Sequence, residues 1–154
     1  MPEKLDSIDR AILRTLQREA KIQNVELAER VGLSPSPCLR RVRLLEEAGV
    51  IERYAALVNP AKVGLELTIF ARVWVTGPDE KTIAAFVDAI SKLPEVVECH
   101  MLAGDYDFLL KIIVADLDAY RRFRLEKLGR IKCVRDIKSD IPMQMVKQTW
   151  AVPL

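Results

Sequence analysis

The chain has 154 residues, with 24 Lys and Arg against 22 Asp and Glu, so its net charge at pH 7 is +2. This balance excludes a general polycation, and any affinity for nucleic acid must come from a local concentration of basic residues. Half of the residues are hydrophobic, which is enough to bury a core and argues against disorder.

The composition also bears on compartment and chemistry. The charged stretch 1–9 lacks the apolar core of a signal peptide, and no apolar run reaches the ~20 residues that cross a bilayer, so we expect a cytoplasmic protein with no membrane contact. Three separated cysteines and one histidine give neither a disulfide framework nor zinc-ligand spacing. Without a phosphate-binding glycine loop, a paired-carboxylate signature or a Ser–His arrangement, the sequence predicts no enzyme, metal or cofactor site.

The first fifty residues repeat apolar positions at helical spacing and predict three helices. The first is expected from Asp6, a capping residue, through Ala20. The second begins after Asn24 and stops at Gly32, because a residue without a side chain suits the left-handed conformation that follows a helix end. A tight turn then leads into the third.

The third predicted helix has two different faces. Ser34 is expected to cap it, and prolines in its first turn break no intrahelical hydrogen bond. At about 100° per residue, the side chains that fall on the inner face are Cys38, Leu39, Val42 and Leu45. The side chains on the opposite face are Ser36, Arg40 and Arg43, with Arg41 flanking them. One face therefore packs and the other is basic.

The glycine turn between the second and third helices is typical of a helix-turn-helix, whose second helix lies in the major groove of DNA. The residues that we predict to contact double-stranded DNA are Asn24, Ser34, Ser36, Pro37, Arg40, Arg41 and Arg43. Arginine suits guanine edges and phosphates alike, so the sequence does not assign the three arginines individually. A solvated charged face on an ordinary three-helix bundle is the alternative interpretation.

The second half of the chain predicts a different fold. Residues 50–64 are expected to form an extended linker between a domain at 1–49 and a domain at 65–154. The segments after the linker are a strand at 67–75, a helix at 79–93, strands at 96–102 and 108–115, a helix at 116–128 and a strand at 134–141. This order is the ferredoxin-like βαββαβ arrangement, with both helices on one face of a four-stranded sheet. The whole chain is thus predicted to be α+β.

The strands of this domain carry apolar side chains on both faces. In the strand 67–75, Ile69 and Val73 lie on one face, and Phe70 and Trp74 lie on the other. Since the helices cover only one face, the simplest cover for the other is the same sheet from a second subunit. The sequence therefore predicts a homodimer.

The link between the predicted strands 96–102 and 108–115 contains Gly104–Asp107 and has the chemistry of a hairpin turn, and a plain turn is one interpretation. The other is an amino-acid site, because carboxylates beside exposed N–H groups complement an ammonium and a carboxylate. The predicted effector contacts are Gly104, Asp105, Tyr106 and Asp107 in the turn, with the nearby apolar Met101, Leu102 and Leu117. Asp105 and Asp107 are expected to hold the ammonium, whereas the three apolar residues suit plain core equally well.

Several motifs in the same order resemble the Lrp/AsnC, or feast-famine, transcription regulators. They are Leu5–Asp9 (LDSID), Asn24–Ala28 (NVELA), Gly32–Cys38 (GLSPSPC), Arg41–Glu46 (RVRLLE) and Gly104–Asp107 (GDYD). The resemblance covers essentially the whole chain. It implies a winged-type helix-turn-helix and a RAM/ACT-like domain that dimerises through its sheet. It also implies assembly of homodimers into octamers, and amino-acid effectors bound where dimers meet, near the Gly104 turn.

The leading prediction is a DNA-binding transcription regulator of amino-acid metabolism genes. Because members of the family vary at the position of Arg40, the operator sequence is not transferable. One alternative is an RNA-binding module, with Phe70, Trp74 and Phe108 stacking bases, although the aromatic-rich signature of such modules is missing. Another is an amino-acid-sensing regulatory subunit of an enzyme that uses its helical domain only for contacts.

Overall fold

The computed structural model describes residues 4–154, which form two compact units. One unit contains the chain up to Leu57, with its helices, together with the segment Val146–Leu154. The other unit, Val58–Met145, contains the sheet. Within the described residues, no helix is both long enough and apolar enough to span a bilayer.

The units differ from the predicted domains 1–49, 50–64 and 65–154 in the linker and at the C-terminal end. The boundary after Leu57 divides the predicted extended linker, in which Pro60–Val63 forms a 3-10 helix. The predicted second domain loses the segment Val146–Leu154, which packs with the helical unit because Leu154 contacts that unit's hydrophobic core. The first three residues of the predicted 1–49 domain lie outside the described part of the chain.

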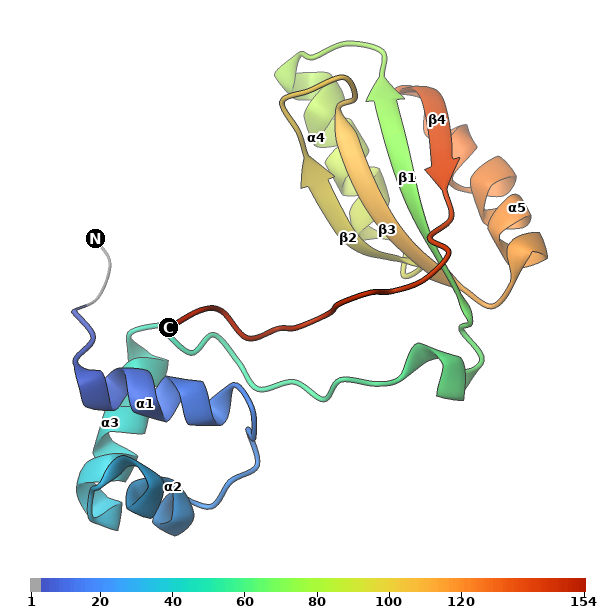
Figure 1. Cartoon of the computed structure of the whole chain (residues 1–154). Coiled ribbons are helices and arrows are strands. Elements are labelled where there is room, and N and C mark those ends of the chain that lie inside the picture. Colours follow the sequence, from blue (N-terminus) through green and yellow to red (C-terminus); the bar gives the residue numbers. More distant parts are fainter. Residues whose placement is uncertain (1–3) are drawn as a thin grey trace. The chain divides into compact units, whose positions relative to one another are not determined.

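The helical unit contains three helices, as predicted (Figure 1). They are α1 (Ser7–Leu16), α2 (Asn24–Val31) and α3 (Pro35–Glu47). Asp6 and Asp9 form a reciprocal capping box at the start of α1. Gly32 ends α2 with φ 72°, the left-handed conformation expected from the sequence.

The core of the helical unit departs from the prediction at two positions. Its buried residues are Ile12, Leu13, Leu27, Ala28, Cys38 and Leu45. The helix α1 ends at Leu16, and Ala20 is exposed, because the polar run between them offers no apolar surface to extend the packing. Leu39 was expected inside but is 40% exposed, since its neighbour Cys38 fills the core position.

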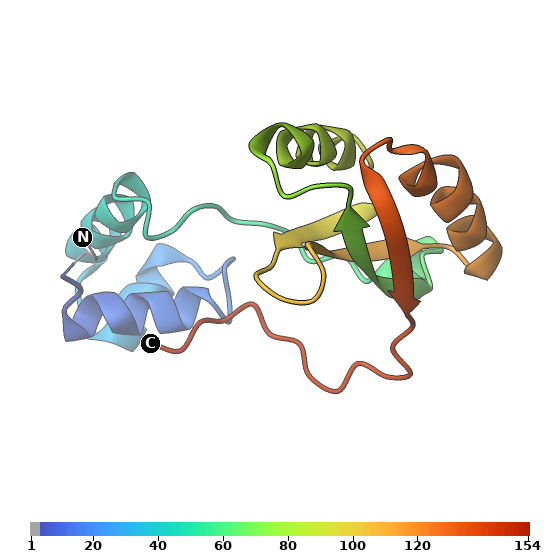
Figure 2. The ribbon, with the colours of Figure 1, turned by 90° about the horizontal axis from the view of Figure 1, so that it is seen from above.

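The second unit has the predicted βαββαβ order, which confirms the ferredoxin-like arrangement. Its elements are η1 (Pro60–Val63), β1 (Leu67–Val75), α4 (Glu80–Ser91), β2 (Val96–Met101), β3 (Phe108–Val114), α5 (Leu117–Glu126), η2 (Leu128–Arg130) and β4 (Val134–Asp140). The strand order is β2-β3-β1-β4, and every neighbouring pair is antiparallel. Figure 2 shows α4 and α5 on the same face of the sheet.

The core of this unit lies between the sheet and the two helices. The register pairs Ile69 with Ile112 and Val73 with Phe108, and these four side chains are buried. The helix α4 adds Phe86, whose ring lies 4.4 Å from that of Phe108. The sequence had placed Val87 on the inner face, but it is 48% exposed, because the larger Phe86 ring sets the rotation of the helix.

Candidate DNA-binding helix and effector turn

The predicted DNA-contacting face of α3 is open to solvent. Arg40 and Arg43 are exposed, and neither has a carboxylate within ion-pair distance among residues 4–154. The two lie three positions apart, so they share one side of the helix. Ser36 and Pro37, near the helix start, are exposed and small, which lets the backbone approach a duplex closely. The face therefore presents two guanidinium groups that no carboxylate of the described residues neutralises, beside small side chains at the start of the helix.

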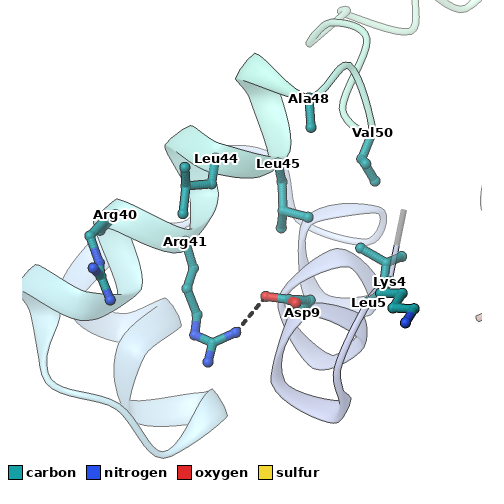
Figure 3. Close-up of a pocket in the computed structure, with 9 residues that line it drawn as sticks. All are labelled: Lys4, Leu5, Asp9, Arg40, Arg41, Leu44, Leu45, Ala48 and Val50. Atoms are coloured by element: carbon teal, nitrogen blue, oxygen red, sulfur yellow. Dashed lines mark hydrogen bonds and ion pairs between the residues drawn. The ribbon is translucent and has the colours of Figure 1, made fainter. Parts of the chain in front are cut away.

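Arg41 is placed differently from its two neighbours. Its Nη1 lies 2.7 Å from Oδ2 of Asp6 and 2.7 Å from Oδ1 of Asp9, and Figure 3 shows the contact with Asp9. The backbone N–H of Asp9, and after it the Arg41 guanidinium, hold the pKa of Asp6 below its usual value. Hydrogen bonds to Asp9 and Asp6 raise the pKa of Arg41. Arg41 therefore connects α3 to the start of α1, and its guanidinium is not part of the unpaired basic face that Arg40 and Arg43 form.

The turn between α2 and α3 is held from within. Asn24 Nδ2 donates to the carbonyl oxygen of Pro35 at 2.8 Å, while Asn24 Oδ1 is buried without a partner among residues 4–154. Ser34 precedes α3 as expected, but its hydroxyl makes no capping hydrogen bond and remains exposed. Asn24 therefore fixes the angle of the turn, and the Ser34 hydroxyl is free to meet a ligand.

A hollow of about 320 Å³ lies beside α3, between this helix and the chain before α1 (Figure 3). Its lining residues are Lys4, Leu5, Asp9, Arg40, Arg41, Leu44, Leu45, Ala48 and Val50. The polar groups of the lining are mostly basic, and Asp9 is already paired with Arg41. Over residues 4–154, the structure brings no three His, Cys, Asp or Glu side chains together in a metal-binding group.

The turn Gly104–Asp107, between β2 and β3, is anchored to β1 by specific contacts. Asp107 Oδ2 accepts a hydrogen bond from the backbone N–H of Val75 at 2.8 Å. Trp74 Nε1 donates to the carbonyl oxygen of Asp105 at 2.5 Å, and the Trp74 and Tyr106 rings meet edge to face at 5.9 Å. One carboxylate of the turn is therefore committed to the scaffold, whereas that of Asp105 has no hydrogen-bond or ion-pair partner among residues 4–154.

The three apolar residues predicted beside this turn do not gather in one place. Met101 and Leu102 are exposed and directly precede the turn. Leu117 begins α5, which follows the opposite end of β3. A strand of seven residues separates the two ends by roughly 20 Å, so one chain does not bring Leu117 to its own turn.

The face of the sheet that α4 and α5 leave uncovered is apolar but carries paired charges. Its half-buried apolar side chains are Phe70, Trp74, Leu109 and Ile113. Arg72 pairs with Asp140 at 2.8 Å, and Lys111 pairs with Glu98 at 2.7 Å. Because these two ion pairs are neutralised within the sheet, burying the face against another surface would leave neither pair without its partner.

Comparison with known proteins connects both sites to one family. Residues 68–152 match the model of the Lrp/AsnC ligand binding domain, and residues 5–52 match the model of a winged helix-turn-helix DNA-binding domain. The chain belongs to the Lrp/AsnC family. The Lrp/AsnC regulators that it matches include the leucine-responsive regulatory proteins of Klebsiella pneumoniae and Escherichia coli (strain K12). Each is 45% identical over 145 residues, covering 94% of this chain and 88% of the relative.

Solved structures of Lrp/AsnC proteins agree with this fold over nearly the whole chain. A transcriptional regulator from Neisseria meningitidis, solved in complex with L-Met, is 40% identical with a TM-score of 0.94, and 97% of each chain is covered. An AsnC family regulator from Agrobacterium tumefaciens is 38% identical with a TM-score of 0.92, again with 97% of each chain covered. This Lrp/AsnC member is a DNA-binding, amino-acid-responsive transcription regulator.

Sequence reasoning missed two positioning residues of this Lrp/AsnC regulator. The sequence places Trp74 on the uncovered sheet face, with base stacking as the alternative, yet its indole N–H holds the Gly104–Asp107 turn. Arg41 was grouped with Arg40 and Arg43, yet it binds the two acids of the α1 capping box. The acid pair was a usable signal for Arg41, because capping carboxylates often accept a second donor.

Proposed function

We propose that this protein binds operator DNA as a homodimer that inserts one α3 helix per subunit into the major groove, with Arg40 and Arg43 as its principal contacts. The observation that carries the proposal is the exposure of these two unpaired guanidinium groups on the second helix of a helix-turn-helix. Arg41 and Asn24 serve this function indirectly, because they hold the helix and the turn in place.

The uncovered sheet face supports the homodimer. Its apolar side chains and internally paired charges suit a sheet-on-sheet contact with a second copy of the chain. A two-fold dimer would place its recognition helices about one turn of DNA apart, roughly 34 Å, or a multiple of it. We expect near-palindromic operators, and further assembly of dimers into octamers.

We propose that the effector is a free amino acid with an aliphatic or thioether side chain, bound at the Gly104–Asp107 turn where dimers meet. Asp105 has an uncommitted carboxylate for the ammonium, and Met101 and Leu102 supply exposed apolar surface. Leu117 contributes only from another subunit. The leucine-responsive relatives and the L-Met complex of the Neisseria regulator support this class of side chain.

The response follows from coupling between assembly and DNA binding. An effector that binds between dimers favours one assembly over another, and each assembly places its α3 helices at different separations. The amino acid therefore selects which pairs of DNA sites are contacted together. In the cytoplasm this would adjust transcription of amino-acid metabolism genes to the supply of the effector.

A binding experiment separates this function from its alternatives. The purified protein is titrated with promoter DNA from amino-acid metabolism genes, with unrelated duplex DNA and with single-stranded RNA, each without and with L-Leu or L-Met. We expect tighter binding to some promoter duplexes than to unrelated duplex, with a shift on adding an amino acid. Equal or tighter binding to RNA would favour the RNA-binding module, and an amino-acid shift in thermal stability without any duplex binding would favour the regulatory subunit.

A further inference from the structure

The last segment of the chain is attached to the DNA-binding unit by a specific pair of hydrogen bonds. Gln17 Nε2 donates to the carbonyl oxygen of Val152 at 3.2 Å, and the backbone N–H of Val152 donates to Gln17 Oε1 at 2.5 Å. The Leu154 side chain packs against the core of the same unit. The Gln17 side-chain amide thus pairs with the backbone of Val152 as a neighbouring β-strand would, because it offers one donor and one acceptor to an extended peptide.

The attachment is confined to the end of the segment. Val146 is 90% exposed and Trp150 is 63% exposed, so the chain before Val152 has little packing to hold it. Gln17, by contrast, is half-buried at the C-terminal end of α1. The position of the whole segment therefore depends on Gln17 and on Leu154, whose carbonyl oxygen also accepts a hydrogen bond from Arg14 Nη1 at 3.4 Å.

The other connection to the sheet unit is also held by the helices. The Tyr54 hydroxyl, at the start of the extended linker, donates to Glu46 Oε1 of α3 at 2.8 Å. Burial and this contact raise the pKa of Tyr54 to about 12. Both of the chain segments that join the two units are thus fixed on the helical unit, one on α3 and one on α1.

The second connection is limited in length as well as fixed at its end. Between the end of β4 at Asp140 and the attached Val152 lie residues 141–151, which reach at most roughly 40 Å when fully extended. A unit joined by one flexible linker can rotate freely about it, whereas a unit held by a second connection of limited length loses part of that freedom.

We propose that Val146–Leu154 is a strap that restricts rotation of the DNA-binding unit, so that each dimer presents its two α3 helices in a narrow range of separations. This inference rests on the proposed function of α3 as the DNA-contacting helix. Gln17 does not lie on the DNA-contacting face. The inference gives it a positioning role, which is to limit the operator spacings that a dimer can bind.

The first test asks whether the strap is held. Hydrogen exchange of the C-terminal peptide is compared in the full-length wild type, Gln17→Ala, Gln17→Glu and the control Gln23→Ala, which removes an exposed glutamine that makes no side-chain cap. We expect the Val152 amide to exchange about tenfold faster in Gln17→Ala. Gln17→Glu keeps the acceptor and should restore part of the protection. Equal exchange in all four proteins would overturn the strap.

The second test asks what the strap does. Wild type and Gln17→Ala are titrated with a single half-site, with the full operator, and with an operator lengthened by about 5 base pairs, half a turn. We expect both proteins to bind the half-site equally. The loss of affinity on going from the full operator to the lengthened operator should be about tenfold smaller in Gln17→Ala than in the wild type. An undiminished loss of affinity, with the Val152 amide unprotected, would refute the positioning role. Failure of the wild type to bind any half-site would refute the proposed function instead, and hydrogen exchange would still decide whether the segment is held.

Discussion

The three arginines of α3 should separate into two classes when operator binding is measured against salt. Each subunit presents two unpaired guanidinium groups, Arg40 and Arg43, so a dimer presents four. Each phosphate that a protein neutralises on duplex DNA contributes about 0.9 to the slope of log K against log salt. If all four arginines contact phosphates, the double variant Arg40→Ala/Arg43→Ala should have a slope smaller by about 3.6. Raising salt fourfold, from about 50 to 200 mM, would then weaken the wild type roughly 150-fold more than the variant.

Arg41→Ala is the matched comparison, because it removes the same charge from the same helix. Its guanidinium is already neutralised by Asp6 and Asp9, so the salt slope should stay near that of the wild type while the melting temperature falls. Fluorescence anisotropy with a labelled operator over a series of salt concentrations gives the slopes, and circular dichroism gives the melting temperatures.

The outcome distinguishes phosphate contacts from base contacts. An arginine on a guanine edge contributes affinity and sequence preference, whereas an arginine on a phosphate contributes chiefly to the slope. A slope change near half the full value would therefore assign one arginine of each pair to a base. An unchanged slope together with unchanged affinity in Arg40→Ala/Arg43→Ala would refute the assignment of this face to DNA, as would an Arg41→Ala variant that flattens the slope equally.

Three further predictions concern the turn, the capping box and the sheet. Asp105→Ala should abolish the amino-acid response without changing DNA affinity. Asp107→Ala should weaken the amino-acid response and also destabilise the fold by about 1 kcal/mol, because the Val75 N–H loses its acceptor. Calorimetry measures amino-acid binding, and thermal unfolding measures the stability. The lowered pKa of Asp6 means that its stabilising contribution is present above the unfolded-state pKa and is lost as the pH falls through the folded one; NMR titration should find this pKa closer to normal in Arg41→Ala but still depressed, since the Asp9 N–H remains. Phe70→Asp should convert dimers to monomers in size-exclusion light scattering at micromolar concentration, and a dimer that survives would contradict the sheet interface.

Much of the fold followed from local patterns. The strand β1 has the predicted bounds because alternation of apolar side chains defines a strand directly, and α2 ends at Gly32 because its backbone conformation is intrinsic to glycine. The rotation of α4 about its axis could not be predicted from its own sequence, because it depends on the contact between Phe86 and Phe108, which are distant in sequence. Rotations and helix ends are decided by packing partners that a single segment does not reveal.

The candidate sites were predictable as segments but not as sets of roles. The sequence correctly placed Arg40 and Arg43 on an exposed face, yet Arg41 differs from them only through acids 32 and 35 positions away. Leu117 was grouped with the Gly104–Asp107 turn on its residue type, and the direction of β3 separates the two. The attachment of Val152 to Gln17 joins positions 135 residues apart and leaves no local pattern.

Trp74 connects the two interfaces of the proposed mechanism. Its ring lies on the uncovered sheet face with Lys138 Nζ 5.2 Å from its centroid, and its indole N–H donates to the carbonyl oxygen of Asp105 in the proposed effector turn. A ligand that draws the turn outward would therefore weaken a hydrogen bond from a residue of the proposed dimer face, and repacking of that face would act on the turn through the same hydrogen bond. Because coupling between binding sites is reciprocal, an amino acid that alters assembly is itself bound with an affinity that depends on assembly. The contact between Trp74 and Asp105 supplies a physical route for this reciprocity within one subunit.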